Sequence, residues 1–438
     1  MSALEVLRAR RVGSSQRLGE GMRRLRSFRG PLLLLFAGAV VSVFVYPWSA
    51  HYISDIWLYW GYGGDIVHGH LPYQAFNFEY PPLAAVVIGL PAIPTASHGL
   101  AYEGLFGALM LLFAIGCLVC CADLAALTGG SAKRAAYAFA VLPLATGALA
   151  REHLDLAPVF LLLAGLLLVA RRSVTGGFGV LGIGTITKAF PLLAAPPAFA
   201  WLWGRGERRA AVRGALVLGV IVVVIGAAVY ALSPSGARYA WDYQVNRPVQ
   251  VESAPAMVLQ AIDAAGGAHV RRFPTHNGDG MTSSASGAVS AAFMALLAGA
   301  VLAATLLAAR GPRDGPLARR RLVLAALTAV AASPAFGKVL SPQFLIWTWP
   351  LFAIAVAWGE RALAGLMLAA TVLTFVEFPF HYFDAAKGET GAVLLVATRD
   401  AVLIAAVGLA FARLARLSAR REEQLLDRAS TPVFARLD

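Results

Sequence analysis

Residues 211–232 read AVRGALVLGVIVVVIGAAVYAL, and Arg213 is the only charged side chain in this stretch. A helix needs about 20 consecutive, mostly apolar residues to cross the hydrocarbon core of a bilayer. The stretch meets that requirement, because every residue after Arg213 is uncharged. It therefore predicts a transmembrane helix.

The composition of the whole chain extends this prediction. Of its 438 residues, 58% are hydrophobic and 14% are charged, and the mean hydropathy is +0.68. Soluble domains usually carry about 25% charged residues. These values exclude a soluble enzyme, a coiled coil and a disordered protein, and they predict an all-α, polytopic membrane protein of about 12 (11–13) helices. Besides 211–232, the predicted apolar runs are 31–50, 103–127, 135–150, 155–170, 177–188, 190–203, 287–309, 322–336, 344–358, 361–380 and 391–412.

Two neighbouring runs, 177–188 and 190–203, are each too short to cross at 1.5 Å per residue. Together they can form a pair that enters the membrane, breaks near Lys188 and Pro191, and returns. A broken backbone is tolerated at this depth only where protein or a water-filled cavity covers it. The shorter, proline-interrupted segment 81–94 is expected to be re-entrant or to lie on the surface.

The basic residues indicate the topology. The chain has 37 Lys and Arg against 24 Asp and Glu, a formal net charge of +13, and the basic residues cluster between apolar runs. Alternation from a cytoplasmic N-terminus puts 28 of the 37 on the inside, as the positive-inside rule requires, so the charge does not indicate nucleic-acid binding. The expected division is a cytoplasmic basic arm (1–30), a transmembrane domain (31–412) with outer loops 51–102 and 233–286, and an amphipathic, basic cytoplasmic tail (413–438) on the anionic inner leaflet.

The three cysteines, Cys117, Cys120 and Cys121, lie in one apolar run. Residues this close on one helix make neither a disulfide framework nor a tetrahedral metal site. We expect them to pack or to face lipid.

Asp55 stands just outside the first apolar run, near Tyr52, Trp57 and Tyr59. Partial desolvation by these rings would raise the proton affinity of the carboxylate toward that of a general base. The alternative is a solvated loop acid at the interface. Asp65 and Glu79 lie in the same loop and have weaker claims.

The same loop holds Tyr73 and Tyr80 in two proline-rich turns, 69–73 and 78–82. Proline fixes φ and restricts the residue before it, so these turns fold the loop back toward the membrane. The tyrosine rings could also pack on the apolar face of a sugar.

Three cations run against the positive-inside bias on the expected outer side: Lys188, Arg247 and Lys338. A lysine at the centre of a membrane helix costs roughly 2.5–3.5 kcal/mol on insertion scales, so Lys188 needs an anionic partner. A lipid phosphate and an internal carboxylate are the two candidates. Arg247 can bind phosphate through two parallel hydrogen bonds.

Residues 151–155, Arg-Glu-His-Leu-Asp, place four ionisable side chains between apolar runs. Such residues are costly unless they reach water or one another. A salt-bridged structural cluster and a substrate-contacting one, through His153 and Asp155, are both open.

In order along the chain, several segments resemble the integral-membrane, polyprenyl-phosphate-dependent glycosyltransferases of the GT-C fold, in particular glycosyltransferase family 87 of actinobacteria. The matching pieces are Asp55 with Tyr59, Gly69-x-x-Pro72-Tyr73, Tyr80-Pro81-Pro82, His153-Leu-Asp155, Lys188-Ala-Phe-Pro191, Arg247-Pro-Val-Gln250-Val-Glu252-Ser253 and Ser341-Pro342-Gln343-Phe344.

The resemblance implies an inverting transfer of a sugar, mannose in that family, from a polyprenyl phosphate to a glycolipid or envelope-glycan acceptor on the outer face of the plasma membrane. It implies that Asp55 is the catalytic base. Because Lys188, Arg247 and Lys338 are cations placed against the positive-inside bias, we expect them to bind the donor phosphate. The expected substrate-binding residues are Tyr59, Tyr73, Tyr80, His153, Asp155, Gln250, Glu252 and Gln343. No carboxylate cluster demands a metal or cofactor. The competing interpretation is a transporter or lipid flippase for an envelope precursor.

Overall fold

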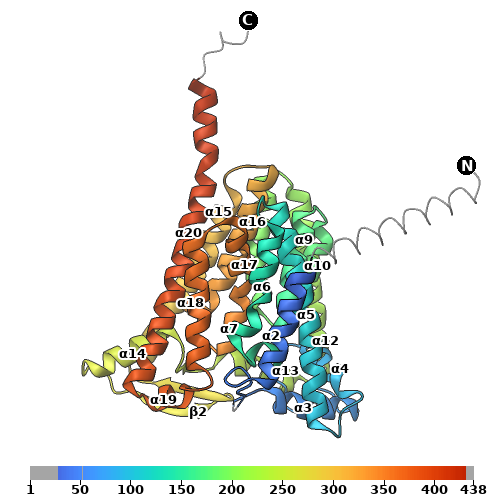
Figure 1. Cartoon of the computed structure of the whole chain (residues 1–438), viewed down its shortest axis with the longest axis vertical. Helices are drawn as coiled ribbons and strands as arrows, with labels where there is room; N and C mark the ends of the chain where they lie inside the picture. Colours follow the sequence, from blue (N-terminus) through green and yellow to red (C-terminus); the bar gives the residue numbers. More distant parts are fainter. Residues whose placement is uncertain (1–27, 52, 431–438) are drawn as a thin grey trace, which may run out of the picture.

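The computed structural model describes residues 28–51 and 53–430 and shows a helical bundle with a small sheet at one end (Figure 1). The α-helices are α2 (Arg29–Phe44), α3 (Ile56–Val67), α4 (Ala84–Ala92), α5 (Gly99–Leu127), α6 (Ala132–Ala140), α7 (Leu142–Thr146), α8 (Leu149–Glu152), α9 (Leu156–Ala170), α10 (Val174–Thr185), α11 (Ala195–Gly204), α12 (Arg208–Leu232), α13 (Pro234–Val245), α14 (Ala254–Ala264), α15 (Ser286–Ala309), α16 (Gly315–Phe336), α17 (Trp349–Trp358), α18 (Arg361–Glu377), α19 (Tyr382–Lys387) and α20 (Thr390–Ser430). The 3-10 helices are η1 (Phe190–Ala194) and η2 (Pro342–Thr348), and the strands are β1 (Val249–Gln250), β2 (Arg271–Thr275) and β3 (Gly278–Thr282).

Among the described residues, four helices are long and apolar enough to cross a membrane unaided: α5, α12, α15 and the 390–419 part of α20. Along α12, which contains the stretch 211–232, only Ala211, Gly214 and Leu218 are buried, so most of this helix faces outward. The chain is therefore a multi-pass membrane protein. The predicted count of twelve spans is not confirmed, because other apolar runs form shorter or broken helices; the run 135–150, for example, is divided among α6, α7 and α8.

The fold is mostly helical, and the all-α prediction is wrong for the second long loop. There β1, β3 and β2 pair in that order as an antiparallel sheet. The turn between β2 and β3 has positive φ at both central residues, His276 (52°) and Asn277 (55°). A two-residue turn of this kind matches the twist of a β-hairpin.

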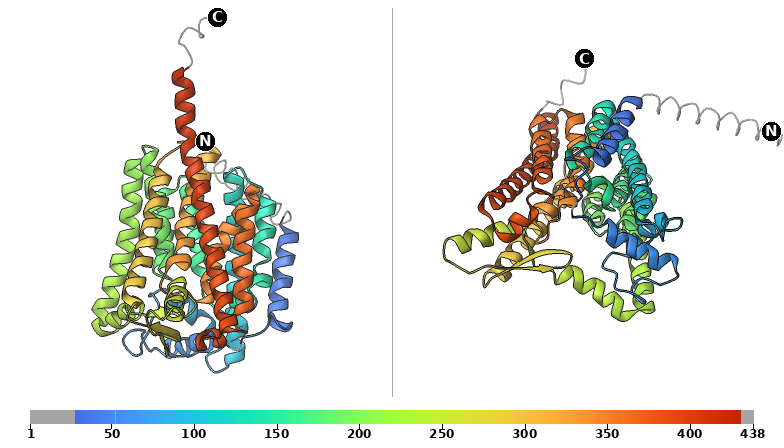
Figure 2. Two further views of the ribbon diagram at one scale, coloured as in Figure 1. Left: turned by 90° about the vertical axis from the view of Figure 1, so that its left-hand side faces the viewer. Right: turned by 60° about the horizontal axis from the view of Figure 1, so that its bottom comes forward.

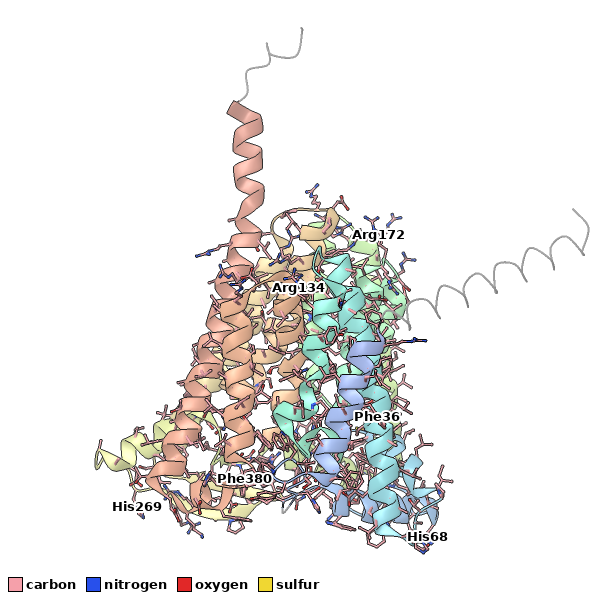
Figure 3. The ribbon with its side chains drawn as sticks, in the orientation of Figure 1. Phe36, His68, Arg134, Arg172, His269 and Phe380 are labelled. Carbon is pink, nitrogen blue, oxygen red and sulfur yellow. The ribbon has the colours of Figure 1, made fainter. Side chains whose placement is uncertain are left out.

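The two long loops lie at the same end of the bundle. In Figure 3, His68, His269 and Phe380 mark this end, and Arg134 and Arg172 mark the opposite one. The loops also touch, because the Ser233 hydroxyl donates to the Tyr73 carbonyl oxygen at 2.8 Å. The right-hand view of Figure 2 shows the yellow and yellow-green second loop beside the blue first loop.

Helices α10 and α11 form the predicted pair that enters and returns. Arg172 precedes α10 and Arg205 follows α11, and both donate to Asp314 Oδ1, at 3.0 and 2.8 Å. The pair therefore begins and ends at one face of the bundle. Between the helices the chain breaks at residues 186–189, and this break carries Lys188 into the interior.

Close packing against α9 fixes the position of α10. A Cβ atom added at Gly165 would lie 3.0 Å from the Gly177 carbonyl oxygen, and one at Gly177 would lie 2.8 Å from the Gly165 oxygen. Small residues allow membrane helices to approach this closely. The approach holds the start of α9, where Asp155 lies, near the end of α10.

The chain ends were predicted to form a basic arm and a separate tail. Residues 1–27 and 431–438, like Tyr52, lie outside the described residues. Instead of starting a new helix after residue 412, the chain continues α20 without a break beyond the bundle (Figure 1). Cys117, Cys120 and Cys121 are buried, so they pack in the core as one of the two expected alternatives.

Candidate active site

A cavity of about 480 Å³ lies where the two long loops meet the break after α10. It combines two carboxylates, three cations, aromatic rings and an apolar edge. Its walls come from both loops, from η2 and from α15 and α16. The lining residues are Asp55, Glu79, Tyr80, Pro81, Lys188, Ala189, Phe190, Leu192, Leu193, Tyr243, Gln244, Arg247, His276, Asn277, Met294, Leu297, Ser333, Gly337, Lys338, Val339, Ser341, Gln343, Phe344 and Trp347.

Asp55 is the residue directly before α3. It lines this cavity, and its side chain is 24% exposed. The hydroxyls of Tyr59 and Tyr80 donate to Asp55 Oδ2 at 3.3 and 3.4 Å. These contacts hold one carboxylate oxygen while the side chain remains accessible. Asp65, by contrast, lies outside the cavity lining and pairs with the exposed His70.

The three candidate tyrosines of the first loop differ in access. Tyr80 lines the cavity, whereas Tyr59 is fully buried beneath it. Tyr73, at a φ of 69°, donates its hydroxyl to the Tyr80 carbonyl oxygen. Tyr59 therefore positions Asp55, and Tyr73 positions Tyr80. Of the three tyrosines, Tyr80 is the one placed to contact a substrate.

Lys188 lies on the cavity wall and already has an internal partner. Its ammonium is 2.6 Å from Asp155 Oδ1 and lies over the rings of Phe344 and Trp347, 5.3 and 5.4 Å from their centroids. The Trp347 indole also donates to Asp155, which is fully buried and does not line the cavity. Of the two partners considered for Lys188, the internal carboxylate is the one in place.

Arg247 and Lys338 lie on the side of the cavity formed by the second loop. Lys338 donates to the Val245 carbonyl oxygen at 2.7 Å, and Arg247 donates to the His276 carbonyl oxygen at 3.3 Å. Burial, and then the nearby Arg247 guanidinium, lower the pKa of Lys338. The same two influences lower the pKa of His276. These groups repel one another, and an anion bound between them would relieve that repulsion.

Glu79, which had only a weak claim as the base from sequence, is a second carboxylate in the cavity. It is 4% exposed and accepts hydrogen bonds from the Tyr62 hydroxyl and the Asn277 amide. Burial raises its pKa, and the Tyr62 hydrogen bond partly opposes that rise. Asn277 and His276 enter the wall from the hairpin turn, and sequence reasoning missed both. The Asn277-Gly278 pair was the available signal, since Asn-Gly favours such turns.

Gln343 lines the cavity, but Gln250 and Glu252 do not. Gln250 contacts Ser341 at 3.3 Å and Glu252 at 3.1 Å, and both glutamine and glutamate are buried. Arg399 of α20 donates to the Glu252 backbone oxygen at 2.6 Å and to Asp400 at 2.8 Å. These contacts tie the strand after Arg247 to a membrane helix.

Replacing Arg399 by Met is expected to destabilise the protein by about 3–5 kcal/mol, because it leaves the buried Asp400 without its charged partner. Thermal unfolding of the purified protein measures this change. The exposed Arg416 on the same helix provides the matched control, and Arg416→Met should unfold like the unmodified chain. Equal unfolding temperatures for the two variants would contradict the anchoring role.

The ionisable segment 151–155 divides between structure and site. Arg151 pairs with Glu103 and with Glu152, as expected of a structural cluster. His153, with a side chain only 4% exposed, lies behind the cavity with Nε2 at 3.7 Å from Asp55 Oδ2. Among the described residues, no group of three or more His, Cys, Asp and Glu side chains is arranged to hold a metal ion.

Comparison with solved structures finds likenesses to this chain. The crystal structure of ArnT from Cupriavidus metallidurans bound to undecaprenyl phosphate is similar to this chain with 17% identity and a TM-score of 0.46, over 89% of this chain and 77% of that one. No protein-family model and no curated protein matches the sequence.

Proposed function

We propose that the protein is an inverting membrane glycosyltransferase that takes its sugar from a polyprenyl-phosphate donor. The observation that carries the proposal is the cavity itself, which places the Asp55 carboxylate in one space with Lys188, Arg247 and Lys338. A base for an acceptor hydroxyl and cations for a leaving phosphate are the two parts that such a transfer needs.

In the proposed reaction, Asp55 takes the proton of an acceptor hydroxyl. The acceptor oxygen attacks the anomeric carbon on the face opposite the lipid phosphate, and the phosphate leaves with the bonding electrons. Arg247 and Lys338 stabilise its charge, with Lys188 at the Asp155 side. The resemblance to glycosyltransferase family 87 favours mannose as the sugar and a glycolipid or envelope glycan as the acceptor.

The edge of the cavity supports a lipid-linked donor. Leu192 on η1 and Met294 on α15 line it, and each is 42% exposed. On a bundle surrounded by lipid, such side chains offer an apolar path from the cavity to the acyl region. A polyprenyl chain could lie there while its phosphate reaches the cations.

The proposed location is the outer face of the plasma membrane, because the basic loops gather at the opposite end of the bundle. In intact cells, a membrane-impermeant thiol reagent should label cysteines introduced at the exposed His68 and His269. It should not label one at the exposed Arg313 at the opposite end. The native cysteines are buried and provide little background. Labelling only at Arg313→Cys would put the active site in the cytoplasm.

A transporter or lipid flippase remains the second candidate, since a cation-lined cavity in a helical bundle also suits an anionic cargo. The cavity differs from a transport path in holding a carboxylate fixed by two tyrosine hydroxyls beside the phosphate-binding cations. Transfer of sugar by the purified protein tests the proposal, and movement of donor across proteoliposomes without transfer would favour the alternative.

A further inference from the structure

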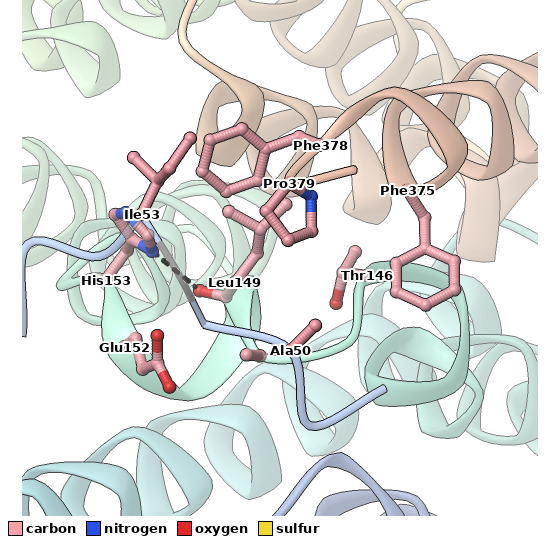
Figure 4. A pocket seen from close by; sticks show the side chains of 10 residues that line it. Ala50, Ile53, Thr146, Leu149, Glu152, His153, Phe375, Phe378 and Pro379 are labelled. Carbon is pink, nitrogen blue, oxygen red and sulfur yellow. Dashed lines mark hydrogen bonds between the residues drawn. The ribbon is translucent and has the colours of Figure 1, made fainter. Parts of the chain in front are cut away.

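A second, much smaller cavity is lined by His153, the histidine that faces Asp55. Its volume is about 10 Å³, close to the smallest that holds one water molecule. Most of its wall is apolar, and Figure 4 shows the His153 ring and the Glu152 carboxylate on the α8 side. The main cavity includes Asp55 but neither of these residues, so Asp55 faces the substrate space and His153 faces the small cavity.

The hydrogen bonds of His153 determine which ring nitrogen carries the proton. His153 Nδ1 lies 3.2 Å from the Leu149 carbonyl oxygen, which can only accept, so Nδ1 is the donor. In the neutral ring Nε2 is then an acceptor, and it points at Asp55 Oδ2 from 3.7 Å. When His153 is neutral and Asp55 is ionised, the lone pairs of Nε2 and Oδ2 face each other. One additional proton between these two atoms would join them by a hydrogen bond.

We propose that His153 receives the proton that Asp55 takes from the acceptor hydroxyl, an inference that rests on the proposed transferase function. The acceptor oxygen loses its proton to Asp55 as it bonds to the anomeric carbon, and the bond from that carbon to the lipid phosphate breaks toward phosphate. The proton then passes from Asp55 Oδ2 to His153 Nε2. Asp55 is ionised again, His153 is an imidazolium, and the proton leaves to water before the next turnover.

One carboxylate and an apolar wall lie beside the ring of His153. The Glu152 carboxylate lies on the wall of the same small cavity as His153, so a positive charge on the ring would have a negative neighbour. Arg151, two residues before His153 in the chain, is engaged by two carboxylates, Glu103 and Glu152. The wall from the end of α18 consists of Phe375, Phe378 and Pro379 and adds no charge (Figure 4).

Two variants test this role. His153→Gln keeps a hydrogen-bonding side chain of similar size but cannot take the proton, so turnover should fall about 10²-fold, at an unchanged donor KM and unfolding temperature. His153→Ala should lose turnover similarly, and added imidazole should restore part of it by occupying the space beside the small cavity. Imidazole should not help His153→Gln, in which that space is filled. His98→Gln, an exposed histidine at the same end, is the control and should keep full turnover.

Full turnover of His153→Gln would overturn the inference, because a non-titrating side chain would then suffice. Loss in both variants without recovery in imidazole would overturn it also, since it would indicate packing alone. In either case the active wild-type protein would leave the transferase function standing. A wild-type protein without transfer activity would remove the function and the inference together.

Discussion

Asp55→Asn should lower turnover by about 10²–10⁴-fold while expression and donor binding stay near normal. Asparagine keeps the shape of the side chain and an oxygen that the Tyr59 and Tyr80 hydroxyls can reach, but it cannot take a proton. The effect should therefore fall on kcat and not on donor KM. Steady-state kinetics with purified protein and a lipid-phosphate sugar measure both.

Two other carboxylates of the first loop provide the controls for this prediction. Asp65→Asn should be nearly silent, because Asp65 pairs with His70 outside the cavity lining. Glu79→Gln should be milder than Asp55→Asn, because Glu79 is 4% exposed and already holds two hydrogen-bond donors. Normal turnover of Asp55→Asn beside an inactive Glu79→Gln would assign the base to Glu79.

The second large effect is expected at Arg247. Removing its guanidinium by Arg247→Ala should lower kcat/KM for the donor by about 10²–10³-fold, as for a lost charge-stabilising donor in an enclosed site. The kcat/KM of Arg247→Lys should lie between those of Arg247→Ala and the unmodified protein, because lysine keeps the charge but loses the planar group that matches phosphate. Donor titrations at saturating acceptor separate the effect on donor use from that on folding.

Arg247 is a better probe of phosphate binding than Lys188. Removing Lys188 would leave Asp155 buried without its ionic partner, so a loss of activity would be mixed with a loss of stability. Arg238→Ala is the matched control, since Arg238 is exposed on α13 and does not line the cavity. If Arg247→Ala and Arg247→Lys both kept full donor affinity, phosphate binding would have to be assigned elsewhere.

Features that depend on local sequence could be predicted. The apolar runs predicted the helices, because a chain that crosses the membrane needs apolar side chains where it contacts lipid or the protein interior. The break near Lys188 followed from run lengths, and the structure places it between α10 and α11. The alternation of inside and outside loops also predicted that the basic loops lie at one end of the bundle. Arg172 and Arg205 both donate to Asp314, so the loops that carry these three residues do lie together.

Features that depend on pairing between distant segments could not be predicted. Gln250 and Glu252 were expected to touch substrate, but Ser341 and Arg399 hold them in the interior. Nothing in the polar stretch around them says which distant helix supplies the partner. Their roles as substrate-binding residues therefore stay predictions that this geometry does not favour.

The same limit applies at the reacting end of the cavity. Asp55 and His153 belong to separate segments of the chain, and their approach depends on how α3 and α8 pack around the first loop. The sheet was also missed, because its strands are short and the His276-Asn277 turn that joins two of them lies in a loop with few apolar residues. Local patterns thus predicted the candidate residues. Tertiary contacts determine which of them line the cavity and which lie behind it and hold the others in place.

The most direct test is to incubate the purified protein with radiolabelled polyprenyl-phosphate mannose and a panel of membrane glycolipid acceptors, and to determine where the label goes. We expect label to appear in at least one acceptor with the anomeric configuration inverted, and Asp55→Asn to transfer almost none. Label that stays on the donor with every acceptor, while proteoliposomes of the same protein carry the donor across the bilayer, would contradict a transferase and establish a transporter.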